Sequence, residues 1–365
     1  MVDLMLALKR DYDTEPVVLI NGKTGDLGKT LDKYSIDYYS YEFRISSINI
    51  QTRFKILRKF TRRLMRYREY FYILGEIKRK GKGIDIVHSN TSITDVGYYI
   101  SRRLGIPHVW HIREYGEKDY RLESIFGKKE LQKKYSNSYV ITISNSIDKY
   151  IKLKYGIEKT FQIYDGVRIV DEYKRKAFES ENVRFVIVGA IRKEKGQFDA
   201  VKACSKLIAE GYNGFELHIV GDDRGAEASR IRSYVTDDHL GGHVFFDGYK
   251  ENVNEVLKDM ECGIMASYSE ALGRVTIEYL ANYMAVIGSR NGATEEILGD
   301  LGLTYEAGNT DELAECMKYY INNREMIAEG GLQRRKRAET FSVVTCAEKV
   351  SEVYKCCLKG NKNEV

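Results

Sequence analysis

Two glutamates and a glycine in one short stretch of the sequence have side chains and spacing suited to a nucleotide ligand. Glu270 and Glu278 stand on either side of Gly273, after an apolar run that ends near Ala266 and at the start of a predicted helix. Gly273 has no Cβ atom, so the backbone there can come close to a ligand. The N-terminus of the helix that follows offers free N–H groups and a partial positive charge, which suits a diphosphate.

The two carboxylates in this stretch favour different parts of such a ligand. Glu278, inside the helix, can accept two hydrogen bonds from a ribose diol, as acidic residues do in other nucleotide sites. Glu270 precedes the glycine, where it can hold sugar hydroxyls or stabilise positive charge that develops at an anomeric carbon. The candidate diphosphate-binding positions of the turn are Ala271, Leu272, Gly273 and Arg274.

A second glycine-bracketed turn also has the composition of a phosphate site. Gly189 and Gly196 enclose a segment that carries Arg192 and Lys195. Cations in a tight turn suit phosphate binding, since they combine charge with backbone donors. Lys195 is the first candidate for stabilising the diphosphate. Arg192 or Arg274 is a candidate second cation, and the alternative for both loop residues is a solvated surface side chain.

The elements around these turns alternate between short apolar runs and helical stretches. Such a rhythm is typical of an α/β protein with a parallel sheet covered by helices on both faces. In the second half, the predicted strands lie at 183–188, 215–220, 244–246, 263–265 and 285–287, and the predicted helices at 198–210, 226–235 and 274–281. In the first half, strand candidates lie at 16–20, 37–41, 85–88, 108–111, 139–143 and 162–164. The sequence therefore predicts two Rossmann-like, doubly wound domains that face each other across a cleft, with ligands near the carboxyl ends of the strands.

The predicted domains are residues 1–168 and 169–340, followed by a C-terminal segment, 341–365, whose helix crosses back to the first domain. The beginning of the first domain is unusual. A doubly wound domain normally opens with a strand and a glycine-rich turn, whereas residues 1–9 read as a helix. We therefore hypothesise that the first strand of the N-terminal domain is missing from this sequence, through a start site upstream or a truncation.

The stretch 267–278 resembles the Glu-x7-Glu signature of family 4 of the retaining glycosyltransferases, which have the two-domain GT-B fold. Residues 286–289 and 291–296 also resemble that family's strand, glycine turn and acidic residue, and the resemblance extends over essentially the whole chain. It implies that Lys195 stabilises the diphosphate, Glu278 fixes the ribose and Glu270 holds the sugar. It also implies a donor that needs no metal or other cofactor, and we favour a UDP-sugar over a GDP-sugar. One position departs from the family: Ala190 stands where an arginine is usual, which puts the second diphosphate cation in doubt.

The resemblance adds further candidates outside the two turns. His111 ends a predicted strand of the first domain, and the matching histidine of the family often faces the donor sugar, so His111 is a candidate catalytic residue. The alternative is a hydrogen-bonded residue at a strand end. Gly248 and Tyr249 follow a strand near the place where the family holds the nucleotide base, so they are candidates for binding only.

Composition is compatible with this interpretation. The chain has 365 residues, of which 43% are hydrophobic and 30% charged, as in soluble globular proteins. No apolar run approaches the ~20 residues of a membrane span. None of the 6 cysteines stands with histidines at metal-ligand spacing, so we predict reduced thiols, no metal site and a cytoplasmic protein.

Positive charge is concentrated between residues 53 and 82. This stretch also carries six aromatic residues, namely Phe54, Phe60, Tyr67, Tyr70, Phe71 and Tyr72. A basic helix with aromatic residues can lie on an anionic membrane surface or bind nucleic acid. It can also be a solvated helix face that buries its aromatic side chains in the core. We expect no nucleic-acid partner, and we keep peripheral association with the inner face of the cell membrane as a hypothesis.

Taken together, these features predict a retaining, metal-independent glycosyltransferase of polysaccharide or capsule biosynthesis. It would move a hexose-type sugar from a nucleotide donor to a glycan or lipid-linked acceptor. The alternatives are a non-catalytic, glycosyltransferase-like partner subunit, which the missing strand and Ala190 motivate, and a nucleotide-sugar epimerase.

Overall fold

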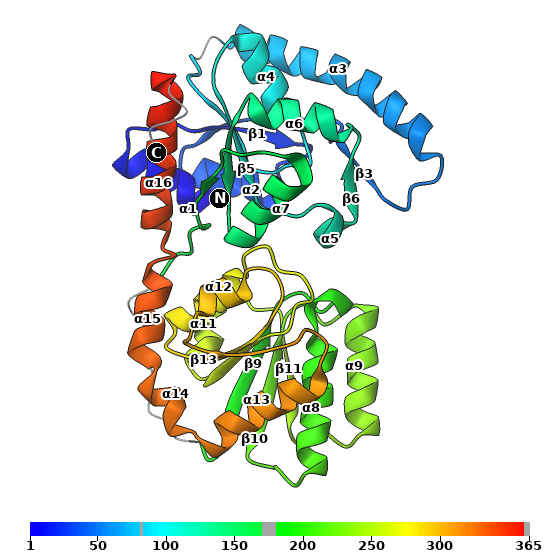
Figure 1. The fold of residues 1–365 in the computed structure, drawn as a ribbon, viewed down its shortest axis with the longest axis vertical. Helices are drawn as coiled ribbons and strands as arrows, with labels where there is room; N and C mark the ends of the chain where they lie inside the picture. Colours follow the sequence, from blue (N-terminus) through cyan, green and yellow to red (C-terminus); the bar gives the residue numbers. More distant parts are fainter. Residues whose placement is uncertain (81–82, 170–179, 361–365) are drawn as a thin grey trace. The chain divides into compact units, whose positions relative to one another are not determined.

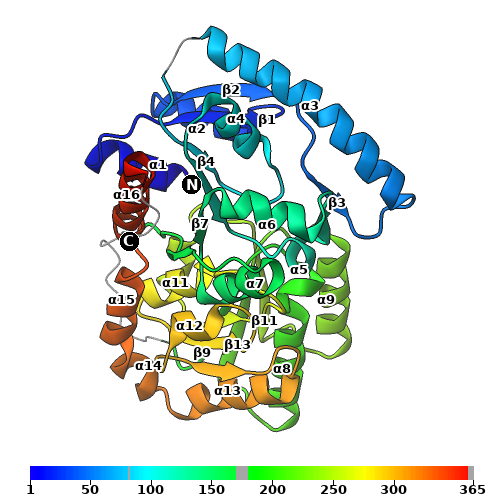
Figure 2. The ribbon, with the colours of Figure 1, turned by 45° about the horizontal axis from the view of Figure 1, so that its top comes forward.

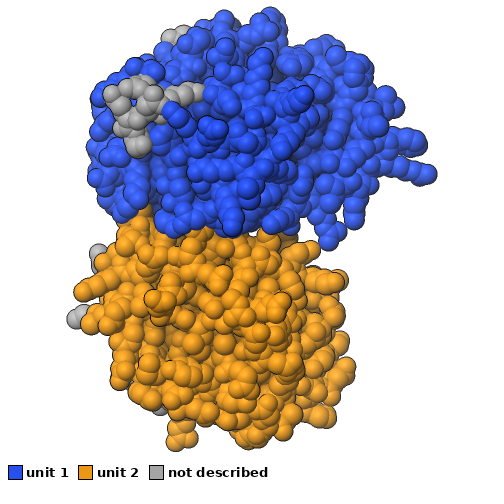
Figure 3. Space-filling model, viewed as in Figure 1, with its two compact units in different colours: residues 1–166, 343–365 blue, residues 167–342 orange. Residues whose placement is uncertain are grey.

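The computed structural model describes residues 1–80, 83–169 and 180–360, and the chain forms two compact units (Figure 3). Unit 1 comprises residues 1–166 and 343–365, and unit 2 comprises residues 167–342. Three parts of the sequence predictions lie outside the described residues: Lys82 of the basic stretch, the start of the second domain beyond residue 169, and the end of the segment 341–365.

Unit 2 is built on a parallel sheet, as the alternating pattern predicts, but the sheet has six strands, of which the one at Leu303–Tyr305 was not predicted. Its strands are β9 (Val183–Val188), β10 (Phe215–Val220), β11 (Val244–Gly248), β12 (Cys262–Met265), β13 (Ala285–Ser289) and β14 (Leu303–Tyr305). The spatial order is β11-β10-β9-β12-β13-β14 (Figure 1), the order of a doubly wound nucleotide-binding domain. The central strands are apolar and almost fully buried, because helices cover both faces of the sheet.

The helices of unit 2 connect these strands or follow the last of them. They are η1 (Lys193–Lys195), α8 (Gln197–Ala209), α9 (Ala226–Asp237), α10 (Asn254–Leu257), α11 (Arg274–Ala281), α12 (Thr294–Leu298), α13 (Thr310–Asn322), α14 (Glu325–Glu329) and α15 (Gly331–Glu339). The bounds predicted for α11 from the sequence agree with the structure, and those of α8 differ by one residue at each end.

Unit 1 is also α/β, but its parallel strands form two separate sheets. β4 (Val87–Ser89), β5 (His108–Ile112), β7 (Tyr139–Thr142) and β8 (Phe161–Gln162) make one, and β1 (Val17–Asn21) and β2 (Asp37–Tyr41) make the other. A short antiparallel pair, β3 (Ser47–Asn49) and β6 (Leu122–Ser124), was not predicted. The described helices not yet named in this unit are α1 (Val2–Asp11), α2 (Gly25–Lys33), α3 (Lys55–Arg79), α4 (Val96–Leu104), α5 (Glu117–Tyr120), α6 (Lys128–Ser136), α7 (Asn145–Tyr155) and α16 (Val343–Lys359).

The first and last helices of the chain pack in the same core of unit 1. Leu4 and Leu8 of α1 and Val350 and Val353 of α16 are all buried there, together with Val109 of β5. The helix predicted at residues 1–9 is therefore present as α1, and the final helix belongs to the first unit.

The C-terminal half of helix α3 makes its apolar contacts with the core, and the N-terminal half is held by polar contacts such as the ion pairs of Lys55 and Lys59 with Glu123. Ile73, Leu74 and Ile77 are buried against β2 and α4, whereas the N-terminal half projects away from β1, β2 and α4 toward β3 (Figure 2). A buried ionic cluster supports the middle of the helix, because Asp95 lies 3.3 Å from Arg66 Nη1 and 2.8 Å from Lys134 Nζ.

The aromatic residues of the basic stretch mostly face solvent. Of the six, Tyr70 is fully buried, while Phe54, Phe60, Tyr67, Phe71 and Tyr72 are exposed. The interpretation that this stretch buries its aromatic side chains in the core is therefore wrong for five of them. In the part of the chain that the structure describes, no helix has the length and hydropathy to cross a membrane.

Candidate active site

The candidate site of unit 2 lies at the carboxyl ends of three neighbouring strands. The strand order changes direction between β9 and β12, and this is the place where open α/β sheets bind ligands. The loop after β9 runs from Gly189 to Gly196, and the loop after β12 runs from Ala266 to Gly273. The turn after β13 follows as the third loop. Both glycine-containing turns singled out from the sequence thus flank the switch point.

Backbone hydrogen bonds hold the three loops together. The Tyr268 N–H donates to the Glu194 carbonyl over 2.9 Å, which joins the second loop to the first. The Ala293 N–H donates to the Glu270 carbonyl over 3.0 Å, which joins the turn after β13 to the second loop. A side-chain contact reinforces the first link, because the Tyr268 hydroxyl donates to Asp199 Oδ2 over 2.6 Å.

Two glycines are required for this close packing. A Cβ atom on Gly196 would lie 2.2 Å from the Ala266 carbonyl oxygen, and one on Gly292 would lie 1.9 Å from the Glu270 carbonyl oxygen. Both glycines also have a positive φ, +70° and +73° respectively, which other residues rarely adopt. The sequence therefore needs glycine at both positions to bring the loops into contact.

This packing brings together two of the three predicted catalytic residues. Lys195 Nζ lies 2.7 Å from Glu270 Oε2. The lysine side chain is 39% exposed and the glutamate side chain 17% exposed, so the pair lies at the surface of the site, where a ligand can reach it. A cation of the kind that suits a phosphate and a carboxylate of the kind that suits sugar hydroxyls therefore lie side by side on adjacent loops.

Glu278 and the start of α11 complete this group. Gly273 caps the helix with φ +80°. The Thr276 N–H donates to the Gly273 carbonyl over 2.9 Å, and the N–H groups of Arg274 and Val275 come before it at the start of the helix. Glu278 is half-buried in the same helix, and burial raises the pKa of its carboxyl, while the nearby Arg274 acts in the opposite direction. A half-buried carboxylate beside a helix N-terminus can accept hydrogen bonds from a diol.

The remaining predicted residues of unit 2 differ in exposure: Leu272 is buried and Ala271 is half-buried. Arg192 and Arg274 are both exposed, and neither has an ion pair among the described residues. Gly189 lies at the end of β9, where its N–H donates to the Val220 carbonyl over 2.9 Å. Gly248 ends β11, and the Tyr249 side chain after it is 75% exposed. One strand, β10, separates β11 from β9, which precedes the Lys195 loop, and two strands, β10 and β9, separate it from β12, which precedes the Glu270 loop.

His111 belongs to unit 1, where it lies fully buried in β5. Its Nδ1 is 3.2 Å from His88 Nε2, and the buried Nε2 has no hydrogen-bond partner. Burial, the charge of Arg113 and the neighbouring His88 hold the pKa of His111 well below its usual value, so the ring is neutral. The unpartnered ring nitrogen is itself buried, so it offers no exposed surface to a ligand in this structure.

Sequence reasoning missed the residues that support the site from behind. The Tyr279 hydroxyl accepts a hydrogen bond from the Val188 N–H over 2.9 Å and so ties α11 to the end of β9. The contact of Tyr268 with Asp199 was also missed. For Tyr279 the sequence offered one signal, a hydroxyl group on an otherwise apolar helix face. For Asp199 the sequence offered no signal of a contact with the site. In the described part of the chain, His, Cys, Asp and Glu side chains form no group of three or more that could hold a metal.

Known proteins resemble this chain in sequence and in fold. Residues 170–337 match the family described as glycosyl transferases group 1. An uncharacterized glycosyltransferase of Methanocaldococcus jannaschii is 26% identical over 339 residues, which cover 89% of this chain and 90% of that protein. The N-acetyl-alpha-D-glucosaminyl L-malate synthase of Bacillus anthracis is 27% identical over 231 residues, which cover 62% of this chain and 56% of the synthase.

Solved structures agree in fold over nearly the whole chain. A glycosyltransferase from Rickettsia africae has a TM-score of 0.75 at 21% identity, covering 99% of this chain and 94% of its own. The Anabaena protein HepE in complex with UDP has a TM-score of 0.76 at 17% identity, with 97% and 95% covered. Both units are thus Rossmann-like domains of the GT-B type, and residues 170–337 resemble the family described as glycosyl transferases group 1.

Proposed function

We propose that this protein transfers a hexose-type sugar from a nucleotide diphosphate donor with retention of anomeric configuration and without a metal. The observation that carries the proposal is the contact of Lys195 with Glu270 at the switch point, beside the N-terminus of α11. Lys195 and the first-turn N–H groups of α11 stabilise the leaving diphosphate, and Arg192 or Arg274 adds charge. Glu278 accepts the ribose hydroxyls, and Glu270 holds the sugar.

The donor proposed for this site carries uridine. HepE, whose fold this chain shares, is described in complex with UDP and with UDP-glucose. The proposed acceptor is a glycan or a lipid-linked saccharide of polysaccharide assembly, and His111 is proposed to position the acceptor or the transferring sugar.

A thermal-shift screen tests the donor site. A ligand that binds the native state raises the melting temperature by mass action. We expect stabilisation by UDP and UDP-sugars, undiminished by EDTA and abolished in Glu278→Ala. Stabilisation that disappears with EDTA would contradict the metal-free mechanism, and stabilisation by GDP or ADP alone would contradict the choice of base.

A product analysis separates transfer from the two alternatives. We expect slow hydrolysis of the donor in the absence of acceptor, and loss of that hydrolysis in Lys195→Ala. Conversion of the donor to its epimer would identify an epimerase. Nucleotide binding without any turnover, in the presence of extracts that contain acceptors, would identify a non-catalytic partner subunit.

We further propose that α3 associates with an anionic membrane surface. Its exposed apolar side chains recur every three or four positions, namely Ile56, Phe60, Leu64, Tyr67 and Phe71, and we call this set the apolar stripe. Leu57 widens the stripe at the N-terminal end. Exposed cations without an ion pair accompany it in the described residues: Arg53, Arg58, Arg68 and Lys78. Apolar and basic side chains on one exposed helix are typical of interfacial binding.

Flotation with lipid vesicles tests the membrane proposal. We expect retention on vesicles that contain anionic lipid and release by high salt. Equal retention on vesicles of phosphatidylcholine alone would contradict a role for the basic residues.

A further inference from the structure

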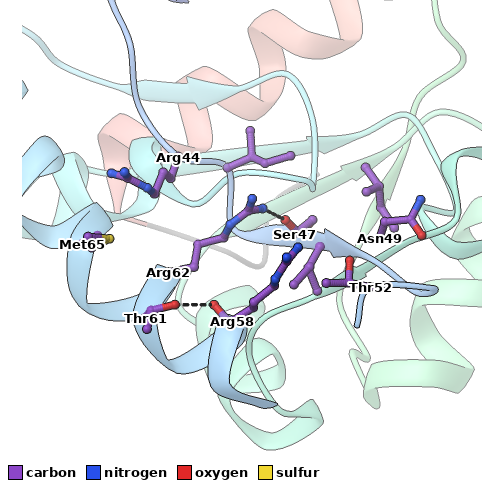
Figure 4. A pocket seen from close by; sticks show the side chains of 11 residues that line it. Arg44, Ser47, Asn49, Thr52, Arg58, Thr61, Arg62 and Met65 are labelled. Atoms are coloured by element: carbon purple, nitrogen blue, oxygen red, sulfur yellow. Dashed lines mark hydrogen bonds between the residues drawn. The ribbon is translucent and has the colours of Figure 1, made fainter. Parts of the chain in front are cut away.

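A pocket of about 440 Å³ lies at the N-terminal end of α3, in unit 1 and outside the candidate active site. Helix α3 forms one wall and the segment of β3 forms the other (Figure 4). Its volume is within the range of small-ligand sites. The lining residues are Arg44, Ile45, Ser47, Ile48, Asn49, Thr52, Arg58, Thr61, Arg62, Met65 and Leu122.

The pocket carries an excess of positive charge. Three arginines line it, and none of the lining residues is acidic. Arg44 is neutralised by an ion pair with Glu69. Arg58 and Arg62 have no carboxylate partner among the described residues, and Arg62 donates only to the Ser47 carbonyl.

The two unneutralised arginines point the same way. Figure 4 shows the side chains of Arg58 and Arg62 extending from α3 toward the segment that carries Ser47. Guanidinium groups that converge in this manner suit a phosphate, because each can donate two hydrogen bonds to its oxygens. The hydroxyl group of Thr52 and the amide of Asn49 add neutral donors beside them, whereas the Thr61 hydroxyl donates to the Arg58 carbonyl over 3.2 Å.

The pocket is adjacent to the apolar stripe of α3. Leu57, Thr61 and Met65 follow one another at intervals of four, so on a helix they form a row between Arg58 and Arg62 on one side and Phe60 and Leu64 on the other. Thr61 and Met65 line the pocket, and Leu57 and Met65 are exposed. A cationic pocket therefore opens beside a surface that suits hydrocarbon.

We propose that this pocket binds the terminal phosphate of a lipid whose hydrocarbon lies along the apolar stripe. The proposal rests on the proposed membrane association of α3, which it refines from a general affinity for negative charge to a headgroup site. A terminal phosphate is preferred over a phosphodiester because it offers more free oxygens and more charge to Arg58 and Arg62. Such a lipid is the chemical class to which a lipid-linked acceptor would belong.

The test compares two kinds of vesicle with the same surface charge. One contains phosphatidic acid, which has a terminal phosphate, and the other contains phosphatidylglycerol, which has none, each in phosphatidylcholine. We expect the unmodified protein to bind the phosphatidic acid vesicles about tenfold more tightly, the size of effect of a charge-assisted hydrogen bond. Arg58→Gln should remove this preference.

Arg68→Gln is the matched control, since it removes one exposed cation from the same helix outside the pocket. It should weaken binding to both kinds of vesicle alike and keep the preference. Equal binding of the unmodified protein to both vesicles would overturn the proposal. A second result would also overturn it: inorganic phosphate stabilises the protein in a manner that depends on Arg58, but the protein shows no preference between the two kinds of vesicle. That result would identify a site for free phosphate. The thermal shift with nucleotides, measured on Arg58→Gln, reports the donor site separately and should be unchanged.

Discussion

Removal of the ammonium group of Lys195 is expected to affect catalysis far more than stability. Lys195 Nζ contacts Glu270 Oε2 at 2.7 Å, but the lysine is 39% exposed, so solvent screens the pair. Ion pairs with this exposure contribute at most about 1 kcal/mol to stability. Lys195→Ala should therefore change the free energy of unfolding by no more than about 1 kcal/mol.

The expected catalytic effect is larger because the charge acts on the leaving diphosphate. Deleting one preorganised donor that stabilises charge in a transition state typically reduces kcat about 10²- to 10³-fold, or about 2.7–4 kcal/mol. The same loss is expected for Glu270→Gln. The double variant should lose less than the product of the two single effects, because the two side chains act as a contacting unit.

Assays of sugar transfer or donor hydrolysis give the loss of activity, and urea denaturation of the same preparations gives the change in the free energy of unfolding. Lys193→Ala is the matched control, because Lys193 lies in the same 3-10 helix, is exposed and has no ion pair among the described residues. A loss of activity in Lys195→Ala no greater than in Lys193→Ala would refute the assignment. A loss of activity fully explained by unfolding would refute it equally.

Three further predictions concern the loops and the buried titratable groups. Gly292→Ala should destabilise the protein by more than about 2 kcal/mol in urea denaturation, because the new Cβ atom would meet the Glu270 carbonyl oxygen and the residue has a positive φ. Gly214→Ala is the control, since the space around its Cβ position is open, and it should leave the free energy of unfolding nearly unchanged. Glu278→Gln should raise the free energy of unfolding near neutral pH, because burial raises the pKa of this carboxyl and disfavours its ionised form. This gain in stability should shrink as the pH falls through that pKa. The affinity for UDP should fall about 10- to 100-fold in the same variant. The imidazole of His111 should not titrate between about pH 5 and pH 8 in NMR spectra, because burial keeps it neutral; a titration in that range would contradict the described burial.

The sequence was most informative where secondary structure follows local pattern. β10 and α11 have the bounds that the apolar runs predict, because strand and helix periodicities are local properties. The pairing of β3 with β6 was not predictable, since strands of three residues carry little pattern and their partners are far apart in the chain. The exposure of the aromatic residues on α3 also depends on tertiary packing, because only part of a long helix meets the domain.

The charged residues of the candidate site could be predicted from the sequence, but the residues that pack behind them could not. Glycine spacing and charge pointed to Lys195 and Glu270 as ligand-binding residues of two turns, and the family resemblance implied that both belong to one site. The structure places the two side chains in contact. The hydrogen bond of Tyr268 to Asp199 joins a loop to a helix 69 positions earlier, and no local pattern encodes it. His111 and the donor-site residues belong to different units, so their common role stays a prediction.

The packing of α1 against α16 has a consequence for folding during synthesis. The core of unit 1 that contains Leu4, Val109 and Val350 cannot close until the last helix of the chain has left the ribosome. Unit 2, residues 167–342, has all its strands and its own core available before that point. We therefore expect the unit that is second in sequence to become resistant to protease first on the ribosome, in contrast to the usual order in which N-terminal domains fold first.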